Sequence, residues 1–373
     1  MIISEKQKLY ETSETGSNTT LNFDIQRRMA AHVRSKLCSS VFRCGLFKNK
    51  VAIVSGGGTG IGKAIATELL YLGCKVVIAS RNAKKLEAGA EEIRTWLRAN
   101  NHDSELHIIP CNIRKEEEVQ NLISTTVKNH GQLDFLVNNG GGQFLSPAKD
   151  IQLKGWNAVI ETNLTGTFLM CREAYNQWMK DHGGAIVNII ADMWKGFPML
   201  SHTGAARAGV DNLTKSLSLE WVHSGVRVNS VAPGVVYSET AAANYKDKNV
   251  FELAKPLLPY HRLGTVEEIS SAVCFLLSPG ARFITGETVR IDGGASNYSC
   301  HTLQIPGGGT ATGEAVTAVP RVFAWARGVI PGGGSFCGGG PSLNDRGAWL
   351  RLECPGRPPA DPPPAPVWCR YRS

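Results

Sequence analysis

The chain has 373 residues, of which 42% are hydrophobic and 19% charged, and its net charge is +8. This length suits one large α/β domain with extensions, and no apolar run approaches the roughly 20 residues of a membrane span. The scattered basic residues argue against nucleic-acid binding and are compatible with anionic ligands such as nucleotides or coenzyme A. The ten cysteines form no Cys-x-x-Cys pair, so we expect no metal site and no disulfide framework.

The two ends of the chain differ in composition from its middle. Residues 1–47 are first polar and then basic and poor in acids. We expect them to be poorly ordered, either as an organelle presequence or as a solvated lead-in to the first strand. Residues 299–373 contain glycine runs and a proline-rich stretch, which predict a disordered tail. Residues 48–298 remain as the predicted folded domain.

Within residues 48–298, short apolar segments alternate with segments of helical spacing. Strands are predicted at 51–54, 75–81, 106–113, 133–141, 184–190, 226–234 and 288–294. Helices are predicted over 63–70, 82–100, 115–129, 156–179, 203–221 and 266–277, the last of them after an irregular insert. This order predicts right-handed βαβ units and therefore an α/β, doubly wound parallel sheet, the Rossmann fold.

The first strand leads into a glycine-rich turn, Ser55-Gly56-Gly57-Gly58-Thr59-Gly60-Ile61-Gly62, which opens a helix. A strand, a glycine turn and a helix in this order place a phosphate against the free N–H groups of the helix N-terminus. The spacing is Gly-x-x-x-Gly-x-Gly and not the usual Gly-x-Gly-x-x-Gly. Alone it is weak evidence, because such turns also close ordinary βα connections.

Basic residues follow the second strand. Arg81 comes directly after it, with Lys84 and Lys85 close behind. An acidic residue here would bind the adenosine ribose of NAD, whereas a basic one pairs with the 2′-phosphate of NADP. We therefore predict NADPH as cofactor, with Arg81 and Lys85 at its phosphate. The alternative is a surface arginine without such a role.

Two further strand ends carry Asn138-Asn139-Gly140-Gly141 and Pro233-Gly234-Val235-Val236. A third motif, Asn163-Leu164-Thr165-Gly166-Thr167, lies on the helix after the fourth strand. With the glycine turn, these motifs resemble the short-chain dehydrogenase/reductase family over about residues 48–294. The resemblance implies a homo-oligomer, a tetramer in the family. It also implies that the cofactor is bound by Ser55, Gly56, Thr59, Gly60, Ile61, Gly62, Cys111, Asn112, Ile113, Asn139, Gly140, Arg207, Pro233, Gly234, Val236 and Thr240.

The catalytic positions depart from the family pattern of Ser and Tyr-x-x-x-Lys. By local alignment, Ala191 stands near the Ser, Thr203 at the Tyr and Arg207 at the Lys. A second candidate, Asp211 with Lys215, lies two helical turns later, too far along to reach the nicotinamide. Ketone reduction needs a proton donor such as the missing Tyr, whereas reduction of an enoyl thioester needs hydrogen-bond donors at an enolate oxygen.

Several segments, including Gly140 to Pro147 and Gly204 to Val210, resemble the peroxisomal trans-2-enoyl-CoA reductases of this family. That resemblance implies NADPH-dependent reduction of a fatty enoyl-CoA to the saturated acyl-CoA. We hypothesise that Asn163 and Thr203 polarise the thioester oxygen and that Arg207 holds the cofactor ribose. Tyr237 either protonates C2 or packs in the core.

Two alternatives stay open for the activity. One is a 2,4-dienoyl-CoA reductase or ketoreductase of the same family, and the other is a catalytically weakened NADP-binding scaffold.

The resemblance implies a peroxisomal location, but the chain ends Tyr371-Arg372-Ser373 and not in a Ser-Lys-Leu type tripeptide. Import by that route is therefore expected to fail, which leaves a cytoplasmic or mitochondrial location as the alternative.

Overall fold

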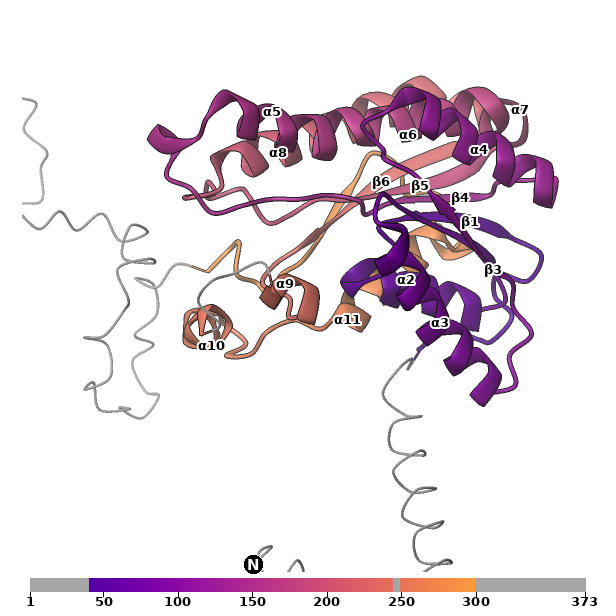
Figure 1. Ribbon diagram of the computed structural model, residues 1–373, viewed down its shortest axis with the longest axis horizontal. Helices are drawn as coiled ribbons and strands as arrows, with labels where there is room; N and C mark the ends of the chain where they lie inside the picture. Colours follow the sequence, from indigo (N-terminus) through magenta and orange to yellow (C-terminus); the bar gives the residue numbers. More distant parts are fainter. Residues whose placement is uncertain (1–39, 244–248, 299–373) are drawn as a thin grey trace, which may run out of the picture. The chain divides into compact units, whose positions relative to one another are not determined.

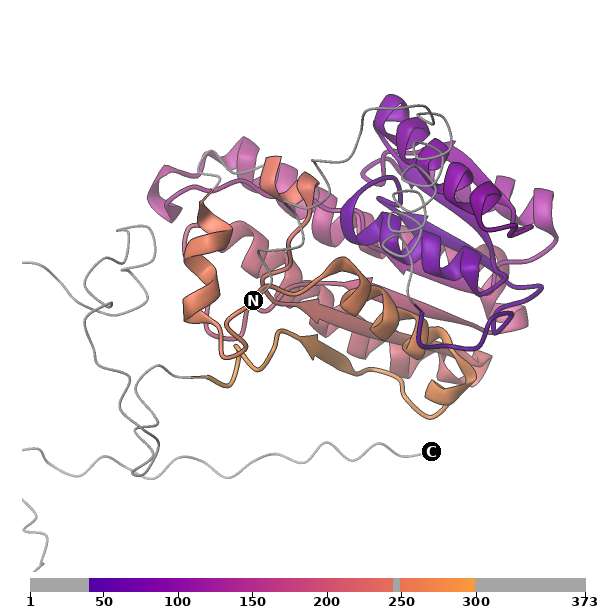
Figure 2. The ribbon, with the colours of Figure 1, turned by 90° about the horizontal axis from the view of Figure 1, so that it is seen from below.

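The computed structural model describes residues 40–243 and 249–298, which form a parallel sheet with helices on both faces (Figure 1). The strand order is β3-β2-β1-β4-β5-β6-β7, and β3 and β7 form the two edges (Figure 2). The chain winds outward from β1 to β3 and then crosses to β4, so the switch point lies between β1 and β4. The strands are β1 (Val51–Ser55), β2 (Lys75–Ser80), β3 (Leu106–Pro110), β4 (Phe135–Asn138), β5 (Gly184–Ile189), β6 (Val226–Pro233) and β7 (Thr288–Ile291).

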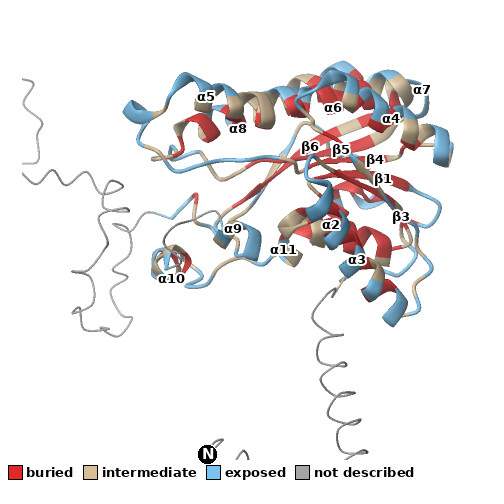
Figure 3. Cartoon of the chain, viewed as in Figure 1, coloured by how far each residue is buried: buried red, intermediate tan, exposed pale blue. Residues whose placement is uncertain are grey.

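Two hydrophobic cores lie on opposite faces of the sheet. Helices α2 (Gly60–Tyr71), α3 (Ala83–Ala99) and α11 (Val266–Leu277) cover one face, and α4 (Glu116–His130), α6 (Gly166–Ala174) and α8 (Ser201–Trp221) cover the other. Side chains alternate between the cores, since Val54 packs in the first and Ile53 in the second. The five inner strands are therefore buried on both sides, as Figure 3 shows, which explains their nearly continuous apolar sequences. The edge strands β3 and β7 are only partly buried.

The Rossmann fold predicted from the sequence is confirmed. The predicted long helix is interrupted: α5 (Leu153–Ile160), α6 and α7 (Lys180–His182) are joined by the π-helical segments η2 (Glu161–Thr165) and η3 (Tyr175–Met179). The insert expected to be irregular contains two short helices, α9 (Glu239–Ala243) and α10 (Val250–Ala254). Short 3-10 turns complete the structure: η1 (Ala148–Asp150), η4 (Val222–Ser224), η5 (Lys255–Leu257) and η6 (Pro279–Ala281).

Packing in the described residues reaches at least to Phe47, the residue before the predicted start of the domain at residue 48. Phe47 is buried, its ring contacts that of Phe135 at 5.1 Å, and its N–H donates to Leu72 O at 2.9 Å. The predicted disorder of residues 1–39 and 299–373 falls outside the described residues. Within the described ranges, no helix has the length and apolar character needed to cross a membrane.

A buried polar network links the centre of the sheet to α8. Asn138 Nδ2 donates to Asn188 Oδ1 at 2.9 Å, Asn188 Nδ2 donates to Thr214 Oγ1 at 2.9 Å, and Thr214 Oγ1 lies 2.7 Å from Ser230 Oγ. All four side chains are buried. Such a network stabilises only while each member keeps its partners.

We predict that Thr214→Val lowers the free energy of unfolding by about 1–3 kcal/mol, because Asn188 Nδ2 loses its acceptor in a dry environment. The control is Ser216→Ala on the same helix, whose hydroxyl bonds only the backbone oxygen of Asn212. This control should change stability by less than about 0.5 kcal/mol. Urea unfolding of both variants checks the prediction, and equal midpoints would contradict it.

Candidate active site

The ends of β1 and β4 are joined by hydrogen bonds of two side chains. Ser55 Oγ accepts from Asn139 N at 3.0 Å and from Gly140 N at 2.9 Å. Asn139 Nδ2 donates to Ser55 O at 3.1 Å and Gly56 O at 3.3 Å. Both side chains were predicted to contact the cofactor, but the structure directs their polar atoms to the protein backbone. These bonds hold the two turns together at the switch point, and a contact of either residue with the cofactor stays a prediction.

The glycine-rich turn is built for close approach of a ligand to the backbone. Gly56 and Gly60 have positive φ values of 68° and 52°, which favour glycine. A Cβ on Gly62 would overlap Gly56 O and the Asn139 amide. The first turn of α2 contains no acidic residue, and its N-cap Thr59 makes no side-chain cap bond. Free N–H groups, including that of Ile61, thus face the turn with the positive end of the helix dipole, which suits a pyrophosphate.

The segment after β6 reaches the same turn. A Cβ on Gly60 would lie 3.2 Å from Ser238 Oγ and 4.0 Å from Thr240 Cβ. This segment is held in place at its start, where Gly234 N, after the buried Pro233, donates to Ile291 O at 3.0 Å. Farther along, Val236 forms a β-bridge with Gly264. The structure therefore brings the predicted cofactor residues of β1, β4 and β6 to one edge of the sheet.

The basic residues after β2 are available for a ligand. Arg81, Lys84 and Lys85 are exposed, and in the part of the chain that the structure describes none of them forms an ion pair. Asn82 caps α3 by accepting from Lys85 N at 3.0 Å. This cap fixes the backbone that carries the three cations. The cluster can attract a phosphate group.

Residues after β3 form part of the same edge. Cys111 is buried, and burial, with the charge of Glu118, raises the pKa of its thiol to about 12. Asn112 N donates to Glu118 Oε2 at 2.8 Å. The Ile113 side chain fills the space that a Cβ on Gly140 would need, at 3.1 Å. Of the three predicted cofactor residues, Ile113 is the one whose side chain shapes a wall beside Gly140.

Asn163 lies in the π-helical segment η2 and is completely buried. Its Oδ1 accepts from Gly142 N at 2.9 Å, and its Nδ2 donates to Gly142 O at 3.0 Å. Because the amide is engaged on both sides by one backbone unit, it fixes the loop after β4. A direct contact of Asn163 with a thioester oxygen, which the sequence suggested, is not what this geometry favours.

The guanidinium of Arg207 on α8 lies against the Cα of Gly141, next to Asn163. Its Nη1 donates to Ile189 O at 2.6 Å. Burial lowers the pKa of Arg207 to about 10, so the group stays charged at neutral pH. Within residues 40–243 and 249–298 it has no carboxylate partner. A half-buried cation without a counter-charge is costly and favours an anionic or electron-rich ligand beside it.

Thr203 and His202, at the start of α8, bury polar atoms without partners. Among the residues that the structure describes, Thr203 Oγ1 and His202 Nε2 have no hydrogen-bond partner, and both residues are at most 1% exposed. The His202 ring contacts Phe144 edge to face at 4.4 Å. The sequence did not predict a place for His202 in the site, because no motif marks this residue and its only signal is its position next to Thr203. Unsatisfied buried polar atoms cluster at ligand sites.

The remaining candidates lie elsewhere. Asp211 binds Lys215 Nζ and Thr288 Oγ1, each at 2.6 Å, so this pair serves the packing of α8 on β7. Burial acts to raise the pKa of Asp211, but these two partners lower it overall. Tyr237 is 50% exposed, and its ring packs edge to face on Phe251 at 5.4 Å. This contact favours a packing role while leaving the phenol open to solvent.

We predict that Gly141→Ala weakens NADPH binding at least about tenfold, or about 1.4 kcal/mol, because the added Cβ displaces the Arg207 guanidinium. The matched control is Gly142→Ala, where a Cβ would meet nothing within 4 Å and binding should change less than about twofold. Fluorescence titration with NADPH measures both constants. Equal affinities of the two variants would show that Arg207 does not support cofactor binding.

Comparison with known proteins agrees with this arrangement. Residues 56–296 match a family model described as enoyl-(acyl carrier protein) reductase. A peroxisomal 2,4-dienoyl-CoA reductase of Danio rerio is 35% identical over 71% of this chain and 87% of its own length. A probable 2,4-dienoyl-CoA reductase of Bacillus subtilis (strain 168) is 35% identical over 66% of this chain and 96% of its own.

Solved structures show the same fold. A citronellol catabolism dehydrogenase of Pseudomonas aeruginosa PAO1 is 44% identical, with a TM-score of 0.61 over 69% of this chain and 100% of that chain. A variant of actinorhodin polyketide ketoreductase, solved with NADPH, is 29% identical, with a TM-score of 0.62 over 69% and 100%. The chain therefore belongs to the short-chain dehydrogenase/reductase family of oxidoreductases.

Proposed function

We propose that this protein uses NADPH to reduce the carbon–carbon double bond of a trans-2-enoyl-CoA, giving the saturated acyl-CoA of fatty acid metabolism. The observation that carries the proposal is the start of α8, where the buried, unpartnered hydroxyl of Thr203 stands four residues before Arg207. Helix α8 contains no tyrosine. The site thus keeps donors for an oxyanion, and α8 lacks the tyrosine that serves as acid for ketone reduction in the family pattern.

The residues fit the cofactor in two ways. The glycine turn would be filled by side chains at Gly60 or Gly62, and the α2 N-terminus is free of acids. When bound, the cofactor supplies a hydride to C3 of the enoyl thioester. Thr203 would donate its hydroxyl hydrogen to the thioester oxygen as negative charge gathers there, and the nearby charge of Arg207 would add to that stabilisation.

Two roles assigned from the sequence change in this proposal. Asn163 becomes a positioning residue, because its amide is taken up by Gly142 and Gly142 borders the glycine that Arg207 contacts. Tyr237 stays a candidate source of the proton at C2, since its half-exposed phenol can exchange with solvent. Its packing on Phe251 is the competing explanation.

A 2,4-dienoyl-CoA is the second candidate substrate, because relatives at 35% identity carry that activity in their names. Purified protein with NADPH should turn over a medium-chain trans-2-enoyl-CoA faster than the matching 2,4-dienoyl-CoA or 3-ketoacyl-CoA. Faster turnover of the dienoyl substrate would make the second candidate the function. Tight NADPH binding without turnover of any substrate would favour a scaffold.

Location, assembly and domain limits stay predictions. Relatives with a peroxisomal name include those of Mus musculus and Rattus norvegicus, at 33% and 34% identity. The tetramer, the peroxisomal location and the limits 1–47, 48–298 and 299–373 rest on the sequence arguments alone.

We predict that Arg81→Ala raises the KM for NADPH about 10- to 100-fold, or about 1.4–2.8 kcal/mol, while the KM for NADH changes little. The reason is the loss of a charge at the 2′-phosphate. Arg282→Ala is the control, because Arg282 is also exposed and follows η6 as its C-cap residue, remote in sequence from the cofactor turns. Steady-state kinetics with both cofactors checks this. An unchanged ratio of the two KM values would remove Arg81 from the site.

We predict that Thr203→Val lowers kcat for the enoyl-CoA about 10²- to 10³-fold with little change in NADPH affinity, as expected for loss of an oxyanion donor. Thr203→Ser should keep most of the turnover, because it keeps the hydroxyl. Tyr237→Phe tests the proton source and should lower kcat if the phenol protonates C2. Unchanged kcat in both Thr203→Val and Tyr237→Phe would contradict the assignment.

A further inference from the structure

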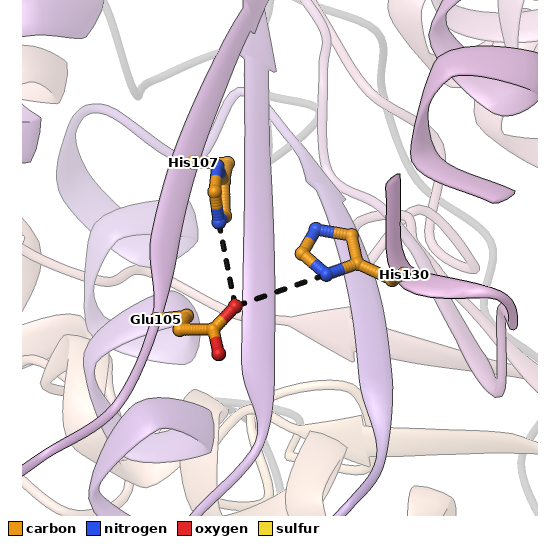
Figure 4. Close-up of side chains that lie close together, drawn as sticks. All are labelled: Glu105, His107 and His130. Carbon is orange, nitrogen blue, oxygen red and sulfur yellow. Dashed lines mark ion pairs between the residues drawn. The ribbon is translucent and has the colours of Figure 1, made fainter. Parts of the chain in front are cut away.

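A second cluster of titratable side chains lies at the edge strand β3, away from the turns described above. It consists of Glu105, just before β3, His107 on β3, and His130, the last residue of α4. Figure 4 shows both imidazoles turned toward one carboxylate oxygen. The start of β3 and the end of α4 belong to the amino edge of the sheet, opposite the carboxyl edge that carries the cofactor turns.

The three side chains meet for reasons of local geometry. Glu105 and His107 are two residues apart along an extended chain, so they point to the same face. His130 reaches that face because α4 runs back along the sheet to the level where β3 begins. Glu105 Oε2 lies 3.6 Å from His107 Nε2 and 3.9 Å from His130 Nδ1, and all ligand atoms lie within 4.8 Å of one another.

From these positions we propose that Glu105 Oε2, His107 Nε2 and His130 Nδ1 form a site for a divalent transition-metal ion of the zinc class, completed by water. Zn–N and Zn–O bonds of about 2.0–2.1 Å require ligand atoms about 3.3 Å apart in a tetrahedron. The three atoms, which lie within 4.8 Å of one another, would therefore have to move closer by side-chain rotation when the ion binds. Two imidazoles and one carboxylate are a ligand set that zinc uses with an open fourth position.

The surroundings of the cluster prepare these ligands. The second carboxylate oxygen, Glu105 Oε1, accepts from Lys75 Nζ at 2.7 Å, which orients Oε2 toward the imidazoles. The His130 side chain is only 4% exposed. Glu105 and His107 are about half-exposed, which leaves room for water on the outer side.

A metal here would join the edge strand to the helix that follows it. In the described sheet, β3 pairs with a neighbouring strand on one side only. A metal ion bound by both His107 and His130 would connect β3 to α4. The site is thus assigned a structural role, separate from the proposed reductase chemistry. Its test does not depend on that chemistry.

The test is a titration of the full chain with Co²⁺ and Zn²⁺, comparing wild type with His107→Ala, Glu105→Gln and the control His223→Ala. His223 is an exposed histidine of η4 outside the cluster. We expect wild type and the control to bind one more equivalent than the two cluster variants, with Co²⁺ giving visible bands of a four-coordinate nitrogen and oxygen site. Zn²⁺ at about 100 times its Kd should raise Tm by about 5 °C in wild type but not in His107→Ala.

X-ray absorption on the zinc-loaded protein separates this site from any thiol site. The wild-type minus His107→Ala difference should contain N and O neighbours at about 2.0–2.1 Å and no sulfur shell at about 2.3 Å. Equal stoichiometry in wild type and both cluster variants would overturn the proposal. A difference spectrum with a sulfur shell would overturn it as well. Unchanged circular dichroism of the variants shows that they are folded.

Discussion

The junction between β1 and β4 is the constraint on which the site depends. Ser55 and Asn139 exchange hydrogen bonds across it at 2.9–3.3 Å, and the chain leaves the sheet in opposite directions on its two sides. The glycine turn, the loop after β4 and the N-terminus of α2 are all positioned from this point. A parallel sheet provides the gap at its switch point, and these two side chains set its width.

The loop that follows β4 at this junction contacts α8 through backbone and side-chain atoms. Asn163, placed by a π-helical turn, holds Gly142, and the neighbouring Gly141 has no Cβ and so admits Arg207. The charge of Arg207 and the hydroxyl of Thr203 therefore lie on one helix beside one loop. In the proposed reaction these two groups could stabilise an enolate without a tyrosine on α8, since hydrogen-bond donors suffice where the oxygen need not be protonated.

The sequence was sufficient for the fold and for placing the candidate cofactor residues at one edge of the sheet, because strand periodicity, glycine spacing and strand-end polarity are local signals. It was insufficient for roles that depend on partners. Asn163 was expected to contact the substrate, but its amide bonds the backbone of Gly142. Ser55 was expected to contact the cofactor, but its hydroxyl accepts from the backbone N–H of Asn139. No sequence motif marks His202 or links Glu105, His107 and His130. Only the three-dimensional structure shows the buried His202 imidazole and the grouping of the other three side chains.

The most direct test of the account is a competition experiment with NADPH deuterated at the transferred position. The protein is offered equal amounts of a medium-chain trans-2-enoyl-CoA and the matching 3-ketoacyl-CoA, and the products are analysed by mass spectrometry and NMR. The account predicts saturated acyl-CoA with one deuterium at C3 as the main product. A 3-hydroxyacyl-CoA with deuterium on the carbinol carbon as the main product would contradict it, because that reaction needs an acid at the ketone oxygen and α8 has no tyrosine to supply it.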